Sequence, residues 1–281
     1  MVRCWALLSM MSGRRVNHTA PITTALMEAI MEAMAMALLQ NKGDLTMWTD
    51  FHLHVLPQID DGASSIEMSI KMLEALSRQQ VDSVFATPHF ILHNTDIHTF
   101  VQARENAYQQ LTGSPLFRPN LPAVQKAAEV AIEPDISKQD CLPLCYEHLS
   151  AILLELPSRG YKSWVLQEIE NIRYGFKVLP VLAHLERYLW YEPEDIKELL
   201  KIPGLVVQIN ASAFGKREGR KLIKELYEQN APVIVGTDSH NCGSRCPNLN
   251  IMEATIHKYR FKEWEPWLQK TKEWFLSQKR I

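Results

Sequence analysis

The sequence predicts an α/β domain built on a parallel sheet, either open or closed into a barrel. Its 281 residues suit one large α/β domain. From Met47 onward, strand-like apolar runs alternate with helical patterns, as expected for a parallel sheet with crossover helices. Histidine, aspartate and glutamate residues recur where the predicted strands end, and in parallel α/β folds these ends share one face.

The first predicted strand runs from Trp48 to Leu56 and carries two histidines in alternation. Side chains at i and i+2 of a strand share a face. His52 and His54 are therefore expected to offer both imidazoles to one point, as metal ligands do. Asp61 follows in a turn marked by Asp-Asp-Gly. Taken alone, the histidine pair is as compatible with chance as with metal binding.

The rest of the domain is predicted to repeat the strand and helix pattern. A helix begins near Ser65, where serine suits an N-cap and Glu67 suits the first turn. Apolar spacing predicts helices at about 65–79, 97–111, 164–174, 194–201 and 217–230, and further strands at about 81–87, 127–132, 151–156, 177–182, 205–209 and 232–235.

Residues 1–46 differ from the rest in being rich in methionine and alanine. A helix is predicted from about Ile22 to Gln40, followed by a C-cap signal at Gly43. Because its apolar residues lie nearly all round, this helix would need a partner surface, for example another subunit. Alternatively, the segment is a dispensable extension or a misassigned start. We therefore predict an N-terminal extension over 1–46 and one domain over 47–281.

The composition is that of an ordinary soluble protein. Hydrophobic residues make up 46%, charged residues 22%, and the net charge is -2, so no strongly basic face for nucleic acid is implied. No apolar run reaches the roughly 18 residues that crossing a bilayer requires. The odd count of 5 cysteines argues against a disulfide framework and indicates a reducing, cytoplasmic location. The sequence leaves the oligomeric state open.

Ligand-type residues at or just past the strand ends form the main functional signal. They are His52, His54, Asp61, His89, Glu129, Glu155, His184, Asp238 and His240. Any one alone is more often a satisfied structural group, but together they are expected to converge. Their number exceeds the needs of one ion, so we infer two or three. Nitrogen and oxygen donors without cysteine suit Mn²⁺, Fe²⁺ or Zn²⁺, and clustered cations favour hydrolysis.

Two arginines indicate the substrate class. Arg187 follows His184 by three residues, and Arg245 follows His240 by five, so both can reach the predicted metal face. The planar guanidinium group matches phosphate oxygens. For either arginine alone, a surface salt bridge is the simpler explanation. Beside a multinuclear site, phosphate binding becomes the better one.

At this point the chain resembles a known family. The segments HLHVLPQIDDG, ATPH, AAEV, LLELP, HLERY and TDSHNCGSR, in this order, look like the polymerase and histidinol phosphatase (PHP) superfamily. They are most similar to its CpsB/CapC-type bacterial protein-tyrosine phosphatases of capsule and exopolysaccharide operons. The resemblance covers about Met47 to the C-terminus. Residues 1–46, the segment 115–122 and the pair Cys242 and Cys246 are not recognised parts of the motif.

The resemblance implies a fold, a cofactor and a substrate. The fold would be a distorted (β/α)₇ barrel with a trinuclear manganese site at the C-terminal ends of the strands. The ligand-type residues named above would be the metal ligands, and Arg187 and Arg245 would bind phosphate. The substrate would be phosphotyrosine on the tail of a cognate bacterial tyrosine kinase that controls polysaccharide export.

The resulting hypothesis is metal-dependent hydrolysis of a phosphomonoester. Asp61, His240 or water would protonate the leaving phenolate. A cysteine-dependent tyrosine phosphatase would need a thiolate in a Cys-x5-Arg phosphate-binding loop, and the sequence contains no such loop. The hypothesis therefore requires no cysteine nucleophile. The alternatives are a small-molecule phosphatase of the histidinol phosphatase type, a phosphoesterase acting on nucleotides, a metal-dependent amidohydrolase, and a PHP-like binding module without turnover.

Overall fold

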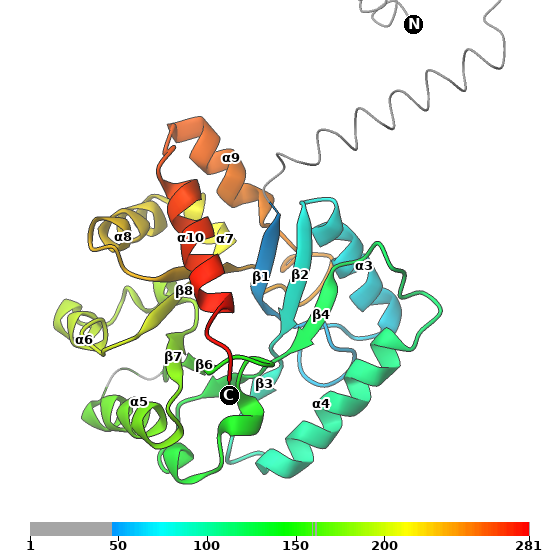
Figure 1. The fold of residues 1–281 in the computed structure, drawn as a ribbon, viewed down its shortest axis with the longest axis horizontal. Helices are drawn as coiled ribbons and strands as arrows, with labels where there is room; N and C mark the ends of the chain where they lie inside the picture. Colours follow the sequence, from blue (N-terminus) through cyan, green and yellow to red (C-terminus); the bar gives the residue numbers. More distant parts are fainter. Residues whose placement is uncertain (1–46, 159, 161, 281) are drawn as a thin grey trace, which may run out of the picture. The chain divides into compact units, whose positions relative to one another are not determined.

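The computed structural model describes residues 47–158, 160 and 162–280. Its strands are β1 (Trp48–Leu53), β2 (Val81–Ala86), β3 (His89–Phe90), β4 (Ala123–Lys126), β5 (Glu129–Ala131), β6 (Ala151–Glu155), β7 (Leu179–Leu182), β8 (Val206–Asn210) and β9 (Val233–Gly236) (Figure 1). Its α-helices are α3 (Ile66–Ser77), α4 (Ile97–Thr112), α5 (Ser163–Phe176), α6 (Pro193–Leu199), α7 (Ala211–Phe214), α8 (Arg217–Glu228), α9 (Asn250–Tyr259) and α10 (Trp264–Leu276). The helix predicted over 22–40 lies outside the described residues, and the boundary at residue 46 stays a prediction.

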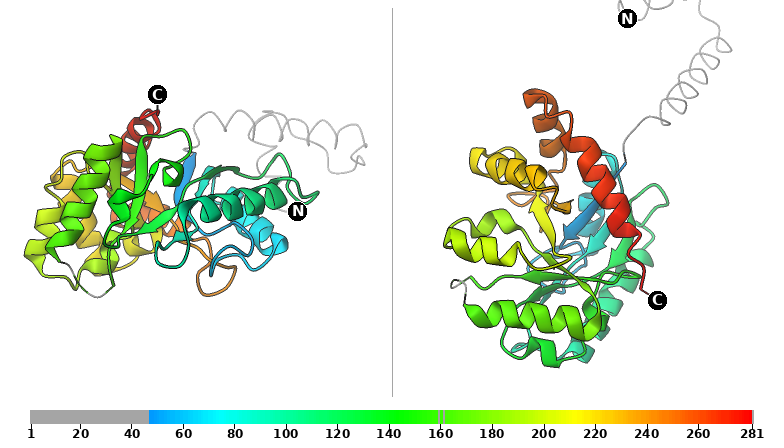
Figure 2. Two further views of the ribbon diagram at one scale, coloured as in Figure 1. Left: turned by 90° about the horizontal axis from the view of Figure 1, so that it is seen from below. Right: turned by 60° about the vertical axis from the view of Figure 1, so that its left-hand side comes forward.

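The strands form a parallel sheet curled into a half-barrel, which confirms the predicted α/β class. One part has the order β1-β2-β4 and the other β3-β5-β6-β7-β8-β9, and the strand pairs within them are parallel. Backbone hydrogen bonds join β1 to the end of β9, with His54 N donating to Ser239 O at 3.0 Å and Asp238 N to His52 O at 2.7 Å. Helices α3, α4, α5, α6 and α8 surround the strands (Figures 1 and 2).

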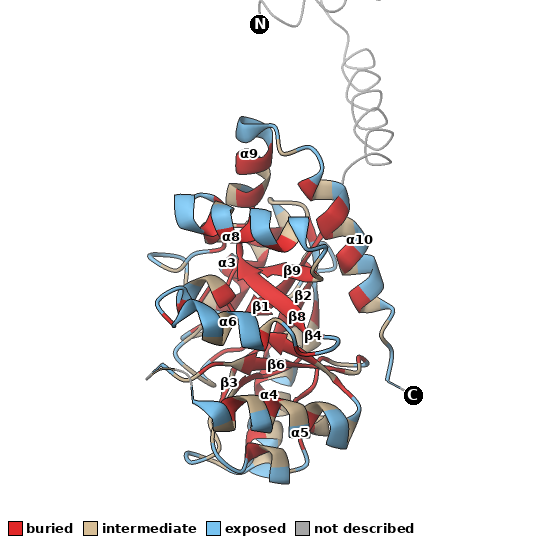
Figure 3. Cartoon of the chain, turned by 90° about the vertical axis from the view of Figure 1, so that its left-hand side faces the viewer, coloured by how far each residue is buried: buried red, intermediate tan, exposed pale blue. Residues whose placement is uncertain are grey.

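Two apolar layers hold the sheet. The outer layer packs the sheet against the surrounding helices and includes Val84 of β2 and Leu73 of α3. The inner layer includes Phe51 and Phe85 from neighbouring strands and Phe275 from α10. The rings of Phe51 and Phe275 meet edge to face at 5.3 Å, and Tyr146 donates its hydroxyl to Phe51 O at 3.0 Å. The buried strands at the centre of Figure 3 are therefore covered on both faces.

Helix starts follow the local capping chemistry. Ser65 caps α3 by accepting a hydrogen bond from Met68 N at 3.3 Å, as its residue type predicts. Asp96 caps α4 through Thr99 N at 2.9 Å. None of the helices among the described residues combines the length and the hydrophobicity needed to cross a bilayer.

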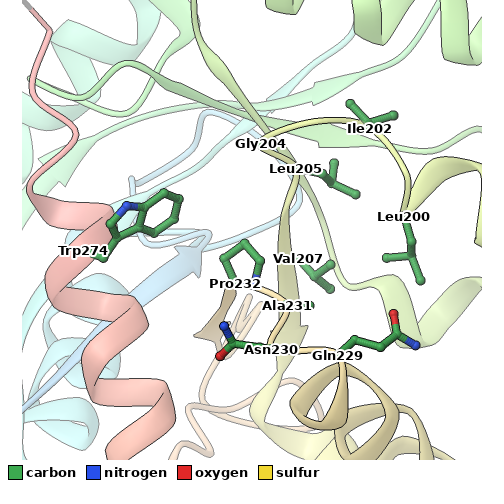
Figure 4. Close-up of a pocket in the computed structure, with 10 residues that line it drawn as sticks. All are labelled: Leu200, Ile202, Gly204, Leu205, Val207, Gln229, Asn230, Ala231, Pro232 and Trp274. Carbon is green, nitrogen blue, oxygen red and sulfur yellow. The ribbon is translucent and has the colours of Figure 1, made fainter.

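A pocket of about 350 Å³ opens beside α10 (Figure 4). Trp274, Leu205 and Pro232 are among its mainly apolar lining residues. Leu205 and Pro232 directly precede β8 and β9, so the pocket lies at the N-terminal ends of these strands. The ligand-type residues follow the opposite, C-terminal ends, so the pocket is separate from the candidate metal centre.

Candidate metal centre

The short strands and the loops after them bring the predicted ligand-type side chains together. His52 and His54 come from β1 and the turn after it, while Asp238 and His240 follow β9. His184 lies two residues past the end of strand β7, which was predicted from the sequence. Three overlapping groups of side chains have ligand atoms within 4.8 Å of one another. The residues predicted from the sequence thus lie close together in space, and the role of each one stays a prediction.

The innermost group is fully buried and consists of His52, His54, Glu129 and Asp238. The Nε2 atoms of His52 and His54 are 3.1 Å apart. They lie 3.0 and 3.2 Å from Glu129 Oε2, and 3.7 and 3.5 Å from Asp238 Oδ1. Two imidazole nitrogens and two carboxylate oxygens therefore point at one small volume.

A second group lies nearer the surface. Asp61 Oδ1 is 3.4 Å from His89 Nε2 and 3.3 Å from His240 Nε2. His54 belongs to this group as well as to the inner one. The Asp61 side chain is 62% exposed, so this group opens toward solvent and a substrate can approach it from that side.

Glu129 links the inner group to a third one. Its Oε2 is 3.1 Å from His89 Nδ1, and Glu155 completes this group. His184 Nε2 lies 2.8 Å from Glu129 Oε1 and 3.7 Å from Glu155 Oε1. One buried carboxylate thus faces four histidines, an arrangement that could hold more than one cation.

Hydrogen bonds on the far side of each ring orient the histidines. His52 Nδ1 lies 3.0 Å from Gln208 Oε1, His54 Nδ1 lies 2.7 Å from Asp60 Oδ2, and His240 Nδ1 lies 3.0 Å from the Asp238 carbonyl oxygen. These oxygens only accept hydrogen bonds, so each Nδ1 is the donor. Nε2 is then the ring nitrogen that faces the centre and that a cation would bind in place of a proton.

The centre fits divalent cations. Glu129 Oε2 and His240 Nε2 are buried and make no hydrogen bond, although ion-pair partners lie within 3.3 Å of both atoms. Such a state is costly unless a cation satisfies these atoms. Histidine nitrogens and carboxylate oxygens are ligands that Mn²⁺, Fe²⁺ and Zn²⁺ share. The described residues therefore supply both the donor chemistry and the unpaired atoms that a metal cluster needs.

Burial and neighbouring charges shift the pKa values within the cluster in opposite directions. Burial by itself would lower the pKa of His54, but the Asp60 and Glu129 carboxylates outweigh it and raise this pKa to about 10. Burial, together with the charge of Glu129, raises the pKa of Glu155 to about 7. For His240, burial and the nearby His54 lower the pKa to about 4.

Backbone strain marks two of the candidate ligands. His184 and Asp238 have φ values of 32° and 51°, in the left-handed region that residues other than glycine rarely adopt. Each lies two residues past the end of a strand, β7 or β9. Strain of this kind persists only where surrounding contacts hold it, and it gathers at functional sites.

Both predicted phosphate-binding arginines reach the cluster. Arg187 Nη2 donates to Asp238 Oδ2, and Arg245 Nη2 donates to Asp238 Oδ1 at 3.1 Å. Arg245 Nη1 also lies 3.4 Å from Asp61 Oδ2. Their side chains are 44% and 38% exposed, so both arginines border the centre and remain accessible to an anion.

Several side chains that hold the candidate ligands in place by hydrogen bonds were not predicted from the sequence. Asp60 accepts hydrogen bonds from His54 and from His89 N, the latter at 3.1 Å. Gln208 Oε1 also accepts from His184 N at 2.6 Å, and Gln208 Nε2 donates to Asn210 Oδ1 at 3.0 Å. The available signals were the carboxylate directly before Asp61 and two amides alternating along an otherwise apolar strand.

The four cysteines among the described residues are free thiols. Burial raises the pKa of Cys141 and of Cys145 to about 12, so both stay protonated and inert at neutral pH. Cys242 and Cys246 are exposed. The sequence predicts no disulfide framework, and none of these four cysteines is bonded to another.

Comparison with known proteins decides the family. The family model described as "Capsular polysaccharide synthesis, CpsB/CapC" matches residues 48–265. The chain belongs to the CpsB/CapC family. The resemblance inferred from the motifs is thereby confirmed.

Relatives named as tyrosine-protein phosphatases, one of them putative, are similar to the chain along most of their length. The tyrosine-protein phosphatase YwqE of Bacillus subtilis is 29% identical over 216 residues, which cover 73% of this chain and 81% of YwqE. The tyrosine-protein phosphatase CpsB of Streptococcus agalactiae is 25% identical over 225 residues, covering 71% and 86%. The putative tyrosine-protein phosphatase CapC of Staphylococcus aureus is 26% identical over 212 residues, covering 70% and 78%.

The CpsB/CapC fold is also seen in a solved structure. It comes from work on YwqE of Bacillus subtilis and CpsB of Streptococcus pneumoniae, described there as metal-dependent tyrosine phosphatases. The TM-score is 0.68 at 22% identity, and the match covers 83% of this chain and 96% of that chain. At this identity the likeness establishes the shared fold.

Proposed function

We propose that this protein is a metal-dependent protein-tyrosine phosphatase with a PHP-type distorted (β/α)₇ barrel. The observation that carries the proposal is one buried carboxylate, Glu129, facing several histidines beside two accessible arginines. Nitrogen and oxygen donors suit hydrolytic metal ions, and guanidinium groups suit phosphate. The tyrosine-protein phosphatases among its relatives support the same reaction.

We assign the metal site to the residues predicted from the sequence, with two or three Mn²⁺ ions as the preferred occupants and Fe²⁺ or Zn²⁺ as alternatives. The proposed ligands are His52, His54, Asp61, His89, Glu129, Glu155, His184, Asp238 and His240. When bound, such ions make water nucleophilic near neutral pH and neutralise charge on a phosphoryl group.

The chain's own residues have distinct proposed roles in catalysis. Arg187 and Arg245 hold the phosphoryl oxygens, because both border the cluster and keep more than a third of their side chains exposed. Asp61 and His240 are the candidates to protonate the leaving oxygen, since they face each other at the solvent side of the centre. Phenolate is a good leaving group, so the contribution of this acid is small.

The proposed substrate is phosphotyrosine on the tail of a cognate bacterial tyrosine kinase that acts in capsular or exopolysaccharide synthesis. The match to a capsular polysaccharide synthesis family supports this choice. A kinase of this kind presents its tail inside the cell, so a cytoplasmic location goes with the proposal. The oligomeric state is left open.

The test is hydrolysis of a phosphotyrosine peptide by the purified full chain, after chelation and after Mn²⁺ is restored. Histidinol phosphate is assayed beside it, and His52→Ala is the site variant. We expect manganese-dependent release of phosphate from the peptide and a loss of at least a hundredfold in His52→Ala. Lys138→Ala, at an exposed pair with Asp135, is the matched control and should keep the activity.

The other outcomes separate the alternatives. Activity confined to histidinol phosphate would keep the metal site and overturn the proposed substrate. Full activity of His52→Ala would overturn the site. Absence of hydrolysis with Mn²⁺, Fe²⁺ or Zn²⁺ would favour a binding module without turnover.

A further inference from the structure

Two neighbouring apolar side chains are exposed in the loop between β7 and α6. Leu189 is 45% exposed and Trp190 is 59% exposed. Within the described part of the chain, the remaining exposed large apolar side chains are isolated in sequence: Met47, Leu116, Tyr174, Tyr259 and Trp274. Single exposed apolar residues are ordinary, whereas a contiguous exposed pair beside a functional site indicates a binding surface.

The loop that carries this pair is held in place on both sides. Tyr188 donates its hydroxyl to Leu156 O at 2.9 Å, and Tyr191 donates its hydroxyl to Pro157 O. Tyr191 N also donates to Tyr188 O at 2.9 Å, which closes a turn around the exposed pair. Both tyrosines are 5% exposed. The exposure of Leu189 and Trp190 is therefore a property of an anchored turn.

The same segment leads directly to the candidate metal centre. The ring of Tyr188 lies 5.6 Å from that of His184 and 5.3 Å from that of Tyr191, which in turn lies 4.6 Å from Trp190. Trp190 follows Arg187 by three residues, and three residues span at most about 11 Å even when extended. The exposed pair thus stands beside the proposed phosphate-binding arginine, at the edge of the centre.

We propose that Leu189 and Trp190 bind an apolar or aromatic side chain of the phosphopeptide substrate, within about three residues of the phosphotyrosine. The inference rests on the proposed phosphatase function and specifies which peptides the site prefers. A rigid tryptophan gives large contact area at low entropic cost. The exposed carboxylates of Glu192 and Glu194 follow at once, so an acidic side chain at that peptide position is disfavoured.

The experiment compares two phosphotyrosine peptides that carry either phenylalanine or serine two residues from the phosphotyrosine, together with p-nitrophenyl phosphate. The Mn²⁺-loaded full chain should prefer the phenylalanine peptide through a lower KM. Trp190→Ala should raise the KM for that peptide about tenfold, which corresponds to about 1.4 kcal/mol. The loss should be at least fivefold smaller with the serine peptide and with p-nitrophenyl phosphate.

Control variants and a binding assay make the result decisive. Trp190→Phe should restore most of the peptide preference, and Trp274→Ala, an exposed tryptophan beside the pocket at the opposite strand ends, should keep it. Binding of the same peptides with a non-hydrolysable phosphonate in place of phosphate is measured in parallel.

Three results would overturn this inference. They are equal binding of the two phosphonate peptides, an equal loss in Trp190→Ala with p-nitrophenyl phosphate, and a changed oligomeric state of Trp190→Ala. Failure of the wild type to hydrolyse either phosphotyrosine peptide would instead overturn the proposed function, because the binding assay reports on Trp190 independently of turnover.

Discussion

At the scale of single residues, Asp60 shows how a side chain outside the proposed ligand set can control it. It receives hydrogen bonds from His54 Nδ1, from Gly62 N at 2.9 Å and from His89 N at 3.1 Å. Burial alone would raise the pKa of Asp60, but the bond from His54 outweighs it and lowers this pKa. The carboxylate stays charged and fixes the His54 ring with Nε2 toward the centre.

Replacing this carboxylate should weaken metal binding. In Asp60→Asn, the amide is a weaker acceptor and can turn its NH₂ toward the ring, so His54 loses its fixed tautomer. We expect Mn²⁺ affinity, measured by titration calorimetry, to fall about 10- to 100-fold. Asp135→Asn, at an exposed carboxylate paired with Lys138, serves as the control. Equal affinities of the two variants would contradict the role of Asp60.

The residue types at the strand ends were sufficient to predict the cluster of candidate ligands. They did not reveal the side chains that hold these ligands in place. His52 and Asp238 could be proposed from their residue types and positions alone. The roles of Asp60 and Gln208 depend on which atom faces which ring, and sequence spacing does not contain that geometry. The αL conformation of His184 was equally hidden, because it is imposed by contacts around the residue.

At the scale of elements, the junction between β1 and β9 requires a very small residue. A Cβ atom on Gly236 would lie 2.5 Å from His52 Cβ and 2.8 Å from His52 N. Real Cβ contacts are longer, so β9 could carry a larger residue here only by moving away from β1. Such a movement would displace His52 from the centre.

Gly236→Ala should therefore destabilise the domain and weaken the site together. We expect the free energy of unfolding, from urea denaturation, to fall by roughly 1–3 kcal/mol, with weaker Mn²⁺ binding. In Gly175→Ala the added Cβ meets nothing within 4 Å, and because Gly175 lies in the last turn of α5 this control variant should keep the wild-type stability or gain up to about 0.5 kcal/mol. A Gly236→Ala protein as stable as the wild type would show that the junction relaxes freely.

Most of the regular elements were predicted from the sequence, whereas β3, β4, α7, α9 and α10 were not. The helix predicted at 97–111 is α4, Ile97–Thr112, because its apolar spacing and its cap agree. The two-residue β3 and the four-residue β4 are too short to show a period. Helix α10 does carry helical spacing at Trp264, Trp267, Leu268 and Phe275, so its signal was present and was overlooked.

At the scale of the whole molecule, the proposed metal ions and the fold should stabilise each other. The buried cluster places carboxylates and imidazoles from β1, β5 and the loop after β9 in one volume. Without cations, these groups need protons or one another to balance their charge. Ligands that bind only the folded state shift the unfolding equilibrium by mass action.

Chelation should accordingly lower the melting temperature. Restoring Mn²⁺ to about 100 times its dissociation constant should add about 2.7 kcal/mol, or roughly 5 to 10 °C for a domain of this size, measured by differential scanning fluorimetry. His52→Ala should show a much smaller shift. An equal shift in the variant would mean that the stabilising ion binds elsewhere.

Whether the sheet is open or curled could not be decided from sequence. Curling depends on the stagger between strands far apart in the chain, such as the Leu53–Ser239 bridge that brings β1 beside the end of β9. Local patterns fix which residues form strands and which face each side chain takes. They do not fix how distant strands are shifted against each other.

Asp238 has a consequence for how the protein responds to its own product. Asp238 Oδ1 lies among the inner group of candidate ligand atoms and also accepts a hydrogen bond from Arg245. Asp238 Oδ2 accepts a hydrogen bond from Arg187. A cation bound there as proposed would draw on this charge and loosen both guanidinium groups, which could then hold inorganic phosphate more strongly. Thermodynamic reciprocity would make the reverse equally true. Under the proposed function, phosphate and metal binding would therefore be energetically linked through a single side chain, and retained product would delay the loss of the ions.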